Sequence, residues 1–213
     1  MIPKLHYISQ GNSPKEHIEN IQKACSSGAE LVQLNIKNIS EKKYLKFAKE
    51  AREITAHFQT RLIICEYFKI AKEIKADGVY IEDSGFSTIN VIENLYSWQI
   101  VGASANNIQD CKNLLSKNVD YICLNPFKDQ ENKGNNTITE LGLNGFTTII
   151  DVLNTKTTII GSGGITISNL SSILETGISG IAVSNSITRN FDSIKEFNTI
   201  LNASSTKEKR YTL

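Results

Sequence analysis

The sequence has little of what marks several classes of protein. Only three of its 213 residues are proline and four are cysteine, and no two cysteines form a C-x-x-C pair. A disulfide framework is therefore not expected. No apolar run approaches the roughly 18 residues of a membrane span, and the N-terminal MIPKLHYIS lacks the apolar core of a signal peptide. These absences predict a cytoplasmic protein with no membrane partner.

An excess of charge of one sign is also missing. Lysine and arginine number 23 against 22 aspartate and glutamate, which gives a formal net charge of +1. No overall field would draw the chain to nucleic acid, so an anionic ligand must be held by a local arrangement of residues. The three histidines, His6, His17 and His57, have neither metal-ligand nor triad spacing.

Apolar runs of strand length are present throughout, and they alternate with amphipathic or polar segments. Eight runs are expected to be strands: Leu5–Ser9, Leu31–Ile36, Arg61–Cys65, Gly78–Glu82, Gln99–Ser104, Asp120–Asn125, Thr157–Gly161 and Gly180–Ser184. This alternation predicts parallel β/α units and a single (β/α)8 TIM barrel over residues 1–203, followed by a polar tail at 204–213. The alternative is an open doubly wound sheet, but no G-x-G-x-x-G follows the first strand.

Helix signals lie between these runs. Glu41–Phe58 places apolar residues on one face at spacings of three and four, and Pro14 is suited to the start of a first helix. Ser168–Glu175 is expected to be a helix that stops at a glycine. Phe146–Leu153 fits a strand or a helix, because it is rich in β-branched residues. Helix is favoured, since a ninth strand would break the alternation.

Two segments near the C-terminal end predict a phosphate cradle. TTIIGSGGI at 157–165 and GIAVSNSI at 180–187 are apolar runs that stop at small residues. Small residues let backbone N–H groups approach an anion closely. On neighbouring parallel strands these two loops would lie side by side at the carboxyl ends, where TIM-barrel enzymes often bind phosphate.

Polar side chains follow the second strand at the same end of the barrel. Period-two spacing points Gln33, Asn35 and Lys37 to one side, so two amides and a cation would converge on one ligand. The alternative is a strand end that leaves its lysine in solvent.

Carboxylates follow the third and fourth strands. Cys65-Glu66 and Glu82-Asp83 could supply oxygen ligands to Mg²⁺, which usually takes one or two carboxylates together with substrate phosphate oxygens. Acidic residues also complement the macrodipole at helix N-termini, and this commoner role is the preferred one from the residues alone.

The fifth and sixth strands lead to further candidates. Ser104 and Asn106 stand at the end of the fifth strand, where either could face a ligand or cap the next helix. Lys133 lies in the polar loop KDQENKGNNT, which is long enough for a lid or binding loop. A lysine in such a loop is more often simply solvated.

Taken in order, these features resemble the thiamine-phosphate synthase family and its close relatives, the thiazole tautomerases. The resemblance covers roughly residues 5–197. It is carried by VQLNIK (32–37), LIICEYFKIAKEIKADGVYIE (62–82), VGAS (101–104), VDYICLNPF (119–127), GSGGI (161–165) and GIAVSNSI (180–187). Enzymes of that family join an aminopyrimidine diphosphate to a thiazole phosphate and release diphosphate.

The resemblance implies a set of site residues. Gln33, Lys37, Ser104 and Lys133 would act on the pyrimidine diphosphate, with Ser104 and Lys133 in the catalytic role. Gly163, Gly164, Ser184 and Asn185 would hold the thiazole phosphate, and Mg²⁺ would bind at Glu66 and Asp83. Asn35, Cys65 and Asn106 occupy further substrate-binding positions. The expected partners are small phosphorylated molecules, and a homo-oligomer is compatible with the sequence.

Several of these positions depart from the family pattern. Asn35 replaces an arginine, Cys65-Glu66 replaces Asn-Asp, Gly85 replaces a second metal-binding aspartate, and Asn106 replaces the histidine that the tautomerases use for proton transfer. Three hypotheses therefore stand, of which the synthase leads. The others are a tautomerase-like isomerase of a thiazole phosphate and a non-catalytic phosphate-ligand binder with a degenerate metal site.

Overall fold

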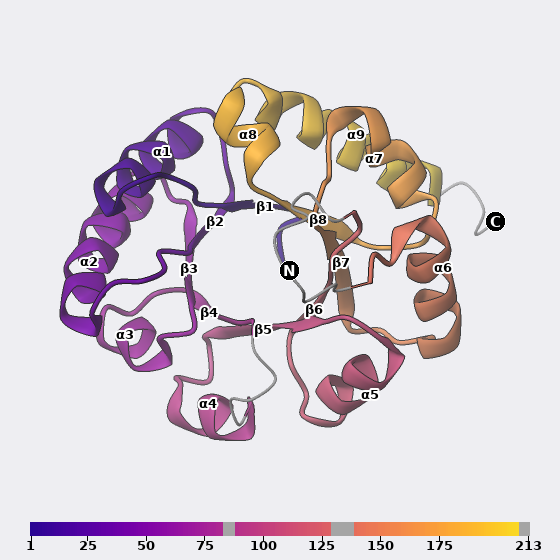
Figure 1. Ribbon diagram of the computed structural model, residues 1–213, viewed down its shortest axis with the longest axis horizontal. Helices are drawn as coiled ribbons and strands as arrows, with labels where there is room; N and C mark the ends of the chain where they lie inside the picture. The colour runs from indigo at the N-terminus through magenta and orange to yellow at the C-terminus, as the bar shows by residue number, and fades with distance from the viewer. Residues whose placement is uncertain (83–87, 129–138, 209–213) are drawn as a thin grey trace.

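Eight parallel strands close into a ring, each hydrogen-bonded to the next and the eighth to the first (Figure 1). The computed structural model describes residues 1–82, 88–128 and 139–208. The strands are β1 (Leu5–Ile8), β2 (Leu31–Leu34), β3 (Arg61–Cys65), β4 (Gly78–Ile81), β5 (Ile100–Ala105), β6 (Tyr121–Leu124), β7 (Thr158–Ser162) and β8 (Gly180–Val183). The predicted TIM barrel and all eight predicted strands are confirmed, with small shifts at the strand ends.

Helices surround the ring on its outside (Figure 1). They are α1 (Pro14–Ser26), α2 (Glu41–His57), α3 (Phe68–Glu73), α4 (Thr88–Asn94), α5 (Ile108–Ser116), α6 (Gly142–Leu153), α7 (Ile167–Leu174), α8 (Asn185–Arg189) and α9 (Ser193–Glu208). Pro14 does open the first helix, and the Ser13 side chain caps it by accepting a hydrogen bond from the Glu16 N–H. The last helix continues to Glu208, so the first part of the expected polar tail is helical.

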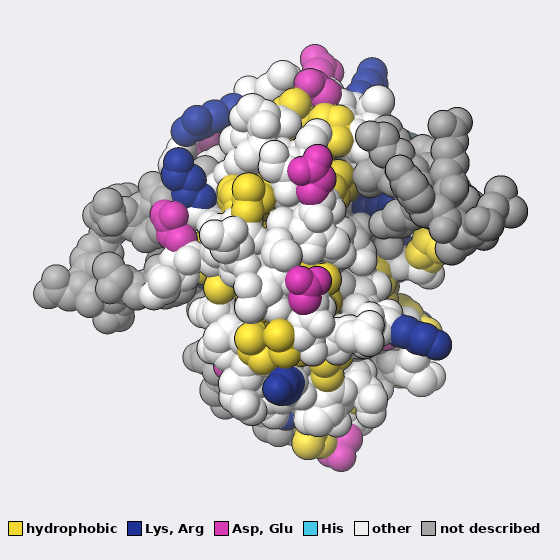
Figure 2. All heavy atoms as spheres, turned by 90° about the vertical axis from the view of Figure 1, so that its right-hand side faces the viewer, with side chains coloured by type: hydrophobic (Ala, Val, Ile, Leu, Met, Phe, Trp, Pro, Cys, Tyr) yellow, Lys and Arg dark blue, Asp and Glu magenta, His cyan; other side chains and the backbone are white. Residues whose placement is uncertain are grey.

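The ambiguous segment Phe146–Leu153 is helical, as predicted, within α6. Phe146 and Ile149 are buried three residues apart, whereas Leu143 and Val152 are 40% and 52% exposed. Figure 2 shows hydrophobic side chains reaching the surface on the side of the molecule where α6 and α7 lie. The helix therefore buries one face and also leaves apolar side chains exposed on its surface.

Alternate residues of each strand belong to two separate packing clusters. One cluster lies between the strands and the helices, and Val32, Leu34 and Ile64 are among its members. The other fills the barrel, and its buried members are Leu31, Ile63, Cys65, Tyr80, Tyr121, Cys123, Ile160 and Ala182. Inward positions beyond this second cluster reach the carboxyl ends of the strands, which we call the barrel mouth.

Two features set the mouth in place. The buried Tyr44 hydroxyl on α2 donates a 2.6 Å hydrogen bond to the Leu34 carbonyl, which ties the end of β2 to the helix layer. Gly102 on β5 leaves room for the ring of Tyr121, because a Cβ at position 102 would overlap that ring.

Among the described residues no helix is both long and apolar enough to cross a membrane.

Candidate active site

The loop after β7 forms one wall of the barrel mouth. Gly163 and Gly164 have φ values of +90° and +65°, a region that favours glycine. A Cβ on Gly163 would lie 2.9 Å from the Cα of Pro126. The turn therefore needs glycine at position 163 for two reasons, its backbone conformation and its close approach to the loop after β6.

Neighbouring loops hold this turn on both sides. The Phe127 N–H donates to the Ser162 carbonyl at 2.7 Å, and the Lys128 N–H donates to the Gly163 carbonyl at 3.2 Å. On the other side, the Ser186 hydroxyl donates to the Ile165 carbonyl at 2.8 Å. The glycine turn is thus held by hydrogen bonds from the loops on both sides of it.

The two predicted cradle segments are neighbours in the structure. β7 and β8 pair in parallel, with Ser162 opposite Ala182. Their ends enclose a cavity of about 210 Å³ lined by Ile8, Ser162, Gly163, Gly164, Ile165, Ala182, Val183, Ser184, Asn185 and Ser186. Small residues and backbone dominate this lining, which suits a phosphate group approached by main-chain N–H donors.

A larger cavity of about 590 Å³ adjoins the first. It is lined by Ile8, Ser9, Gln10, Gly11, Asn12, Pro14, His17, Asn35, Lys37, Asn38, Ile39 and Ser184. Ile8 and Ser184 belong to both linings, so the two cavities meet at these residues. The barrel mouth therefore contains two adjoining cavities, one at the cradle and one beside Lys37.

Lys37 and Asn35 do lie together, as their spacing predicted, but both are engaged by Glu82. The Lys37 Nζ is 2.6 Å from Glu82 Oε2, and the Asn35 Nδ2 donates to Glu82 Oε1 at 2.8 Å. Burial acts to lower the pKa of Lys37, but the hydrogen bond and negative charge of Glu82 outweigh it, so this pKa is raised. Lys37 is therefore a fully charged cation that already has an anionic partner.

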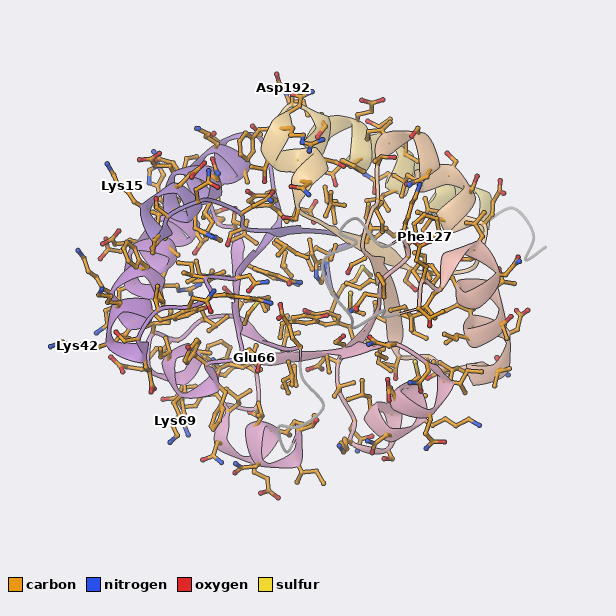
Figure 3. The ribbon with its side chains drawn as sticks, viewed as in Figure 1. Lys15, Lys42, Glu66, Lys69, Phe127 and Asp192 are labelled. Atoms are coloured by element: carbon orange, nitrogen blue, oxygen red, sulfur yellow. The ribbon has the colours of Figure 1, made fainter. Side chains whose placement is uncertain are left out.

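Glu66 comes directly after β3, the strand that lies between β2, which leads to Asn35 and Lys37, and β4, which leads to Glu82. Its backbone has φ +66°, uncommon for a residue with a side chain, and its N–H donates to the Tyr80 carbonyl at 2.9 Å. The Glu66 Oε1 accepts a hydrogen bond from the Glu82 N–H. Figure 3 shows Glu66 on the inner side of the helix layer, whereas the labelled lysines 15, 42 and 69 point outward. Glu66 is thus held at the mouth next to Glu82.

Gln33 lies one layer below the mouth. Its side chain is buried, and its Nε2 is 3.1 Å from His6 Nδ1 and 3.5 Å from the Tyr121 hydroxyl. His6 Nε2 lies 3.0 Å from the Pro3 carbonyl, so the proton belongs on Nε2 and Nδ1 accepts from Gln33. Burial lowers the pKa of His6 to about 4, which keeps the ring neutral.

Cys65 and Ser104 also belong to the layer beneath the mouth. Cys65 is 3% exposed, and burial together with the charges of Glu82 and Glu66 raises the pKa of its thiol well above the usual value. It is a neutral thiol in the floor of the site. The Ser104 hydroxyl accepts a 2.8 Å hydrogen bond from Asn125 Nδ2, and the Tyr80 and Tyr121 rings stack below with centroids 6.2 Å apart.

A buried Ser–His pair supports the end of β2. The Ser9 hydroxyl is 2.9 Å from His17 Nδ1, and it accepts a 3.0 Å hydrogen bond from the Asn35 N–H. Sequence reasoning missed this link because Ser9 and His17 lie on different elements without recognisable spacing. The alternation of β1 places Ser9 on the same side as Leu5 and Tyr7, which face the helices, but it gives no sign of the partner of Ser9.

Other predicted residues take simpler positions or lie outside the described residues. The Asn106 N–H donates to Asp110 Oδ2 at 3.1 Å, and Asn107 caps α5, so this segment does serve as a helix cap. Asp83, Gly85 and Lys133 are not among the described residues. In the described part of the chain, no three His, Cys, Asp or Glu residues gather into a metal-binding group.

The described mouth nevertheless offers oxygen ligands of the kind that Mg²⁺ prefers. Glu66 and Glu82 follow neighbouring strands, and one hydrogen bond already joins them. Two carboxylates fit a Mg²⁺ ion that arrives with phosphate oxygens.

Comparison with known proteins gives consistent matches. The model of a family described as thiamine monophosphate synthase matches residues 5–187. A thiamine-phosphate synthase of Flavobacterium johnsoniae is 33% identical over 191 residues, covering 88% of this chain and 90% of that protein. One from Bacteroides fragilis is 27% identical over 201 residues, covering 93% and 98%. In fold, a thiamine phosphate pyrophosphorylase from Pyrococcus furiosus is similar, with a TM-score of 0.79 at 22% identity and coverage of 94% and 96%.

Proposed function

Because the chain belongs to the thiamine monophosphate synthase family, we propose that it joins an aminopyrimidine diphosphate to a thiazole phosphate and releases diphosphate in thiamine biosynthesis. One observation in the structure carries this proposal. Two adjoining cavities meet at Ile8 and Ser184, one a glycine–serine cradle and the other containing Lys37. A transferase needs two such volumes side by side, since its substrates must react with each other.

The reaction we propose is a substitution at the methylene carbon of the pyrimidine. The bond from this carbon to the diphosphate oxygen breaks, and its electron pair leaves with the diphosphate. The thiazole nitrogen then supplies the electron pair of the new carbon–nitrogen bond, so neither substrate is oxidised or reduced. Charge therefore builds up on the leaving diphosphate, and a nearby cation such as Lys37 stabilises that charge.

The cradle positions the second substrate. Gly163, Gly164, Ser184 and Asn185 would hold the phosphate of the thiazole through backbone N–H groups and small side chains. A phosphate fixed there keeps its ring at the junction of the two cavities, close to the pyrimidine carbon. This positioning turns an encounter of two molecules into a reaction within one complex.

The floor of the site contributes shape and orientation. Ser104, whose hydroxyl accepts a hydrogen bond from Asn125, contacts the pyrimidine substrate in our proposal. The buried Cys65 and Gln33 limit the depth of the site. The stacked Tyr80 and Tyr121 rings exclude water below the reacting groups. Lys133 is proposed as a second cation for the diphosphate on the basis of its sequence position.

We propose that Mg²⁺ binds at Glu66 together with Glu82 or Asp83. The two described carboxylates lie at neighbouring strand ends and fit the oxygen ligands that this ion needs. When bound, Mg²⁺ neutralises part of the diphosphate charge.

Product formation tests the proposal directly. Purified protein with Mg²⁺, the pyrimidine diphosphate and the thiazole phosphate should form thiamine phosphate, and a standard family member run in parallel provides the positive control. Absence of product above a reaction without enzyme, while the control enzyme is active, would refute it.

The two other hypotheses predict different results. A tautomerase would exchange protons at the thiazole ring, yet Asn106 is an amide and cannot act as a general base near neutral pH. A non-catalytic binder would take thiazole phosphate equally well with and without Mg²⁺ and would form no product. Calorimetry with each substrate, with and without Mg²⁺, separates these cases from the synthase.

We further propose a cytoplasmic location, without a nucleic-acid or membrane partner. All four cysteines are buried free thiols, as suits a reducing compartment. The balanced charge of the chain offers no general attraction for polyanions.

A further inference from the structure

Glu82 occupies the groups that an anionic substrate would be expected to use. It follows β4, whereas Lys37 and Asn35 follow β2, and β3 lies between these strands in the ring. The Glu82 carboxylate therefore reaches across the end of β3, with one oxygen 2.6 Å from Lys37 Nζ and the other 2.8 Å from Asn35 Nδ2. A carboxylate bound through both oxygens mimics the contacts of a phosphate group.

The charges at this part of the mouth do not favour a bare anion. Glu66 and Glu82 place two carboxylates beside the single ammonium of Lys37, which is a net charge of −1 over the described ends of β2, β3 and β4. A diphosphate that approaches alone meets like charges, and it must also displace Glu82 to reach Lys37. A divalent cation that arrives with the diphosphate reverses the sign of this region.

We propose that Glu82 is a specificity-determining residue that makes binding of a multiply charged phosphate ester conditional on a divalent cation. In the absence of the cation, Glu82 holds Lys37 and Asn35 and repels the anion. With the cation present, the two carboxylates become attractive and Lys37 can contact the phosphate oxygens. The inference rests on the proposed function only for its choice of diphosphate as the ligand.

The contact is accessible enough to open. The Lys37 and Glu82 side chains are 64% and 30% exposed, so solvent screens their attraction and the pair is weak. A ligand that brings its own counter-charge can therefore displace Glu82. A deeply buried pair would instead act as a permanent structural strut.

Binding of inorganic diphosphate, measured by calorimetry with EDTA and with Mg²⁺, tests this inference. Glu82→Gln removes the charge at nearly constant size, and metal-free diphosphate should then bind about fivefold to tenfold more tightly than to the wild type. The ratio of the affinities with and without Mg²⁺ should fall by a similar factor. Glu82→Ala should change metal-free binding in the same direction, and thermal unfolding identifies any variant that fails to fold.

Two further variants show whether the effect passes through this contact. Glu73→Gln removes a carboxylate from a comparably exposed pair with Lys49, 3.0 Å apart and on the outer helices, and should leave diphosphate binding as in the wild type. In a Lys37→Gln background, the gain from Glu82→Gln should become smaller, because Glu82 then no longer competes for Lys37 and only its direct repulsion of the anion is relieved.

Metal-free affinity that is unchanged or weaker in Glu82→Gln and Glu82→Ala would overturn the inference. An equal gain in Glu73→Gln would do the same, because it would point to a general charge effect. Failure of the proposed function has a different signature: no thiamine phosphate would form, although the diphosphate affinities still responded to Glu82.

Discussion

Replacing Gly163 by alanine tests whether the cradle depends on glycine for conformation, for space or for both. The residue has φ +90°, and a new Cβ would lie 2.9 Å from both the Cα and the Cβ of Pro126. Gly28 provides a matched control, because its φ is +94° but a Cβ there would meet no described atom within 4 Å. The two substitutions share the backbone strain and differ in the contact.

The magnitudes follow from these two geometries. An alanine at positive φ costs about 1 kcal/mol, so Gly28→Ala should lower the free energy of unfolding by about that amount. Gly163→Ala should lower the free energy of unfolding by about 1–3 kcal/mol more than this, because either the glycine turn or the Pro126 backbone must move to relieve the overlap. Urea unfolding followed by circular dichroism measures both values under the same conditions.

Ligand binding gives the second readout. Displacing the turn should weaken binding of inorganic phosphate by about tenfold in Gly163→Ala, equivalent to about 1.4 kcal/mol, and should leave Gly28→Ala like the wild type. Equal destabilisation in the two variants, with phosphate affinity unchanged in both, would refute the reasoning that the approach of Pro126 fixes the cradle.

Two further predictions concern buried histidines. Burial lowers the pKa of His6 from 6.5 to about 4 on folding, so its contribution to the free energy of unfolding is complete above pH 6.5, and up to about 3 kcal/mol of it is lost as pH falls from 6.5 to 4. Urea midpoints measured across this pH range should therefore fall less steeply toward acid in His6→Gln than in the wild type, whereas His57→Gln should behave like the wild type. Both variants should keep the part of the acid dependence that comes from His17, whose pKa is also lowered by burial. Ser9→Ala leaves His17 Nδ1 and the Asn35 N–H without their partner and should lower the free energy of unfolding by about 1–3 kcal/mol, whereas the exposed Ser26→Ala should change it little. A Ser9→Ala protein as stable as the wild type would contradict the supporting role of the Ser–His pair.

The barrel could be predicted because its signals are local and repeated. Each strand is a short apolar run between helical segments, and eight such runs leave few other ways to close a sheet. The side-by-side placement of the two cradle segments could be predicted for the same reason, since β7 and β8 are consecutive and each ends at small residues. Even the helix at Phe146–Leu153 was predicted by counting units and not by its own pattern.

The chemistry of the mouth was harder to predict, because it depends on side chains that cross between strands. Spacing showed that Gln33, Asn35 and Lys37 share a side, but not that Gln33 stops one layer lower and bonds to His6. It also gave no sign that Glu82 spans β3 to reach Lys37. Such contacts depend on the radius of the closed ring and on side-chain rotamers, neither of which a linear pattern records.

The division of the core into two clusters affects how this protein can diversify. Neighbouring residues of one strand, such as Leu34 and Asn35 at the end of β2, face different surroundings, one packed against helices and the other open to ligand. A mutational library confined to inward positions can therefore sample new substrates while the helix-facing contacts that carry most of the buried apolar surface stay intact.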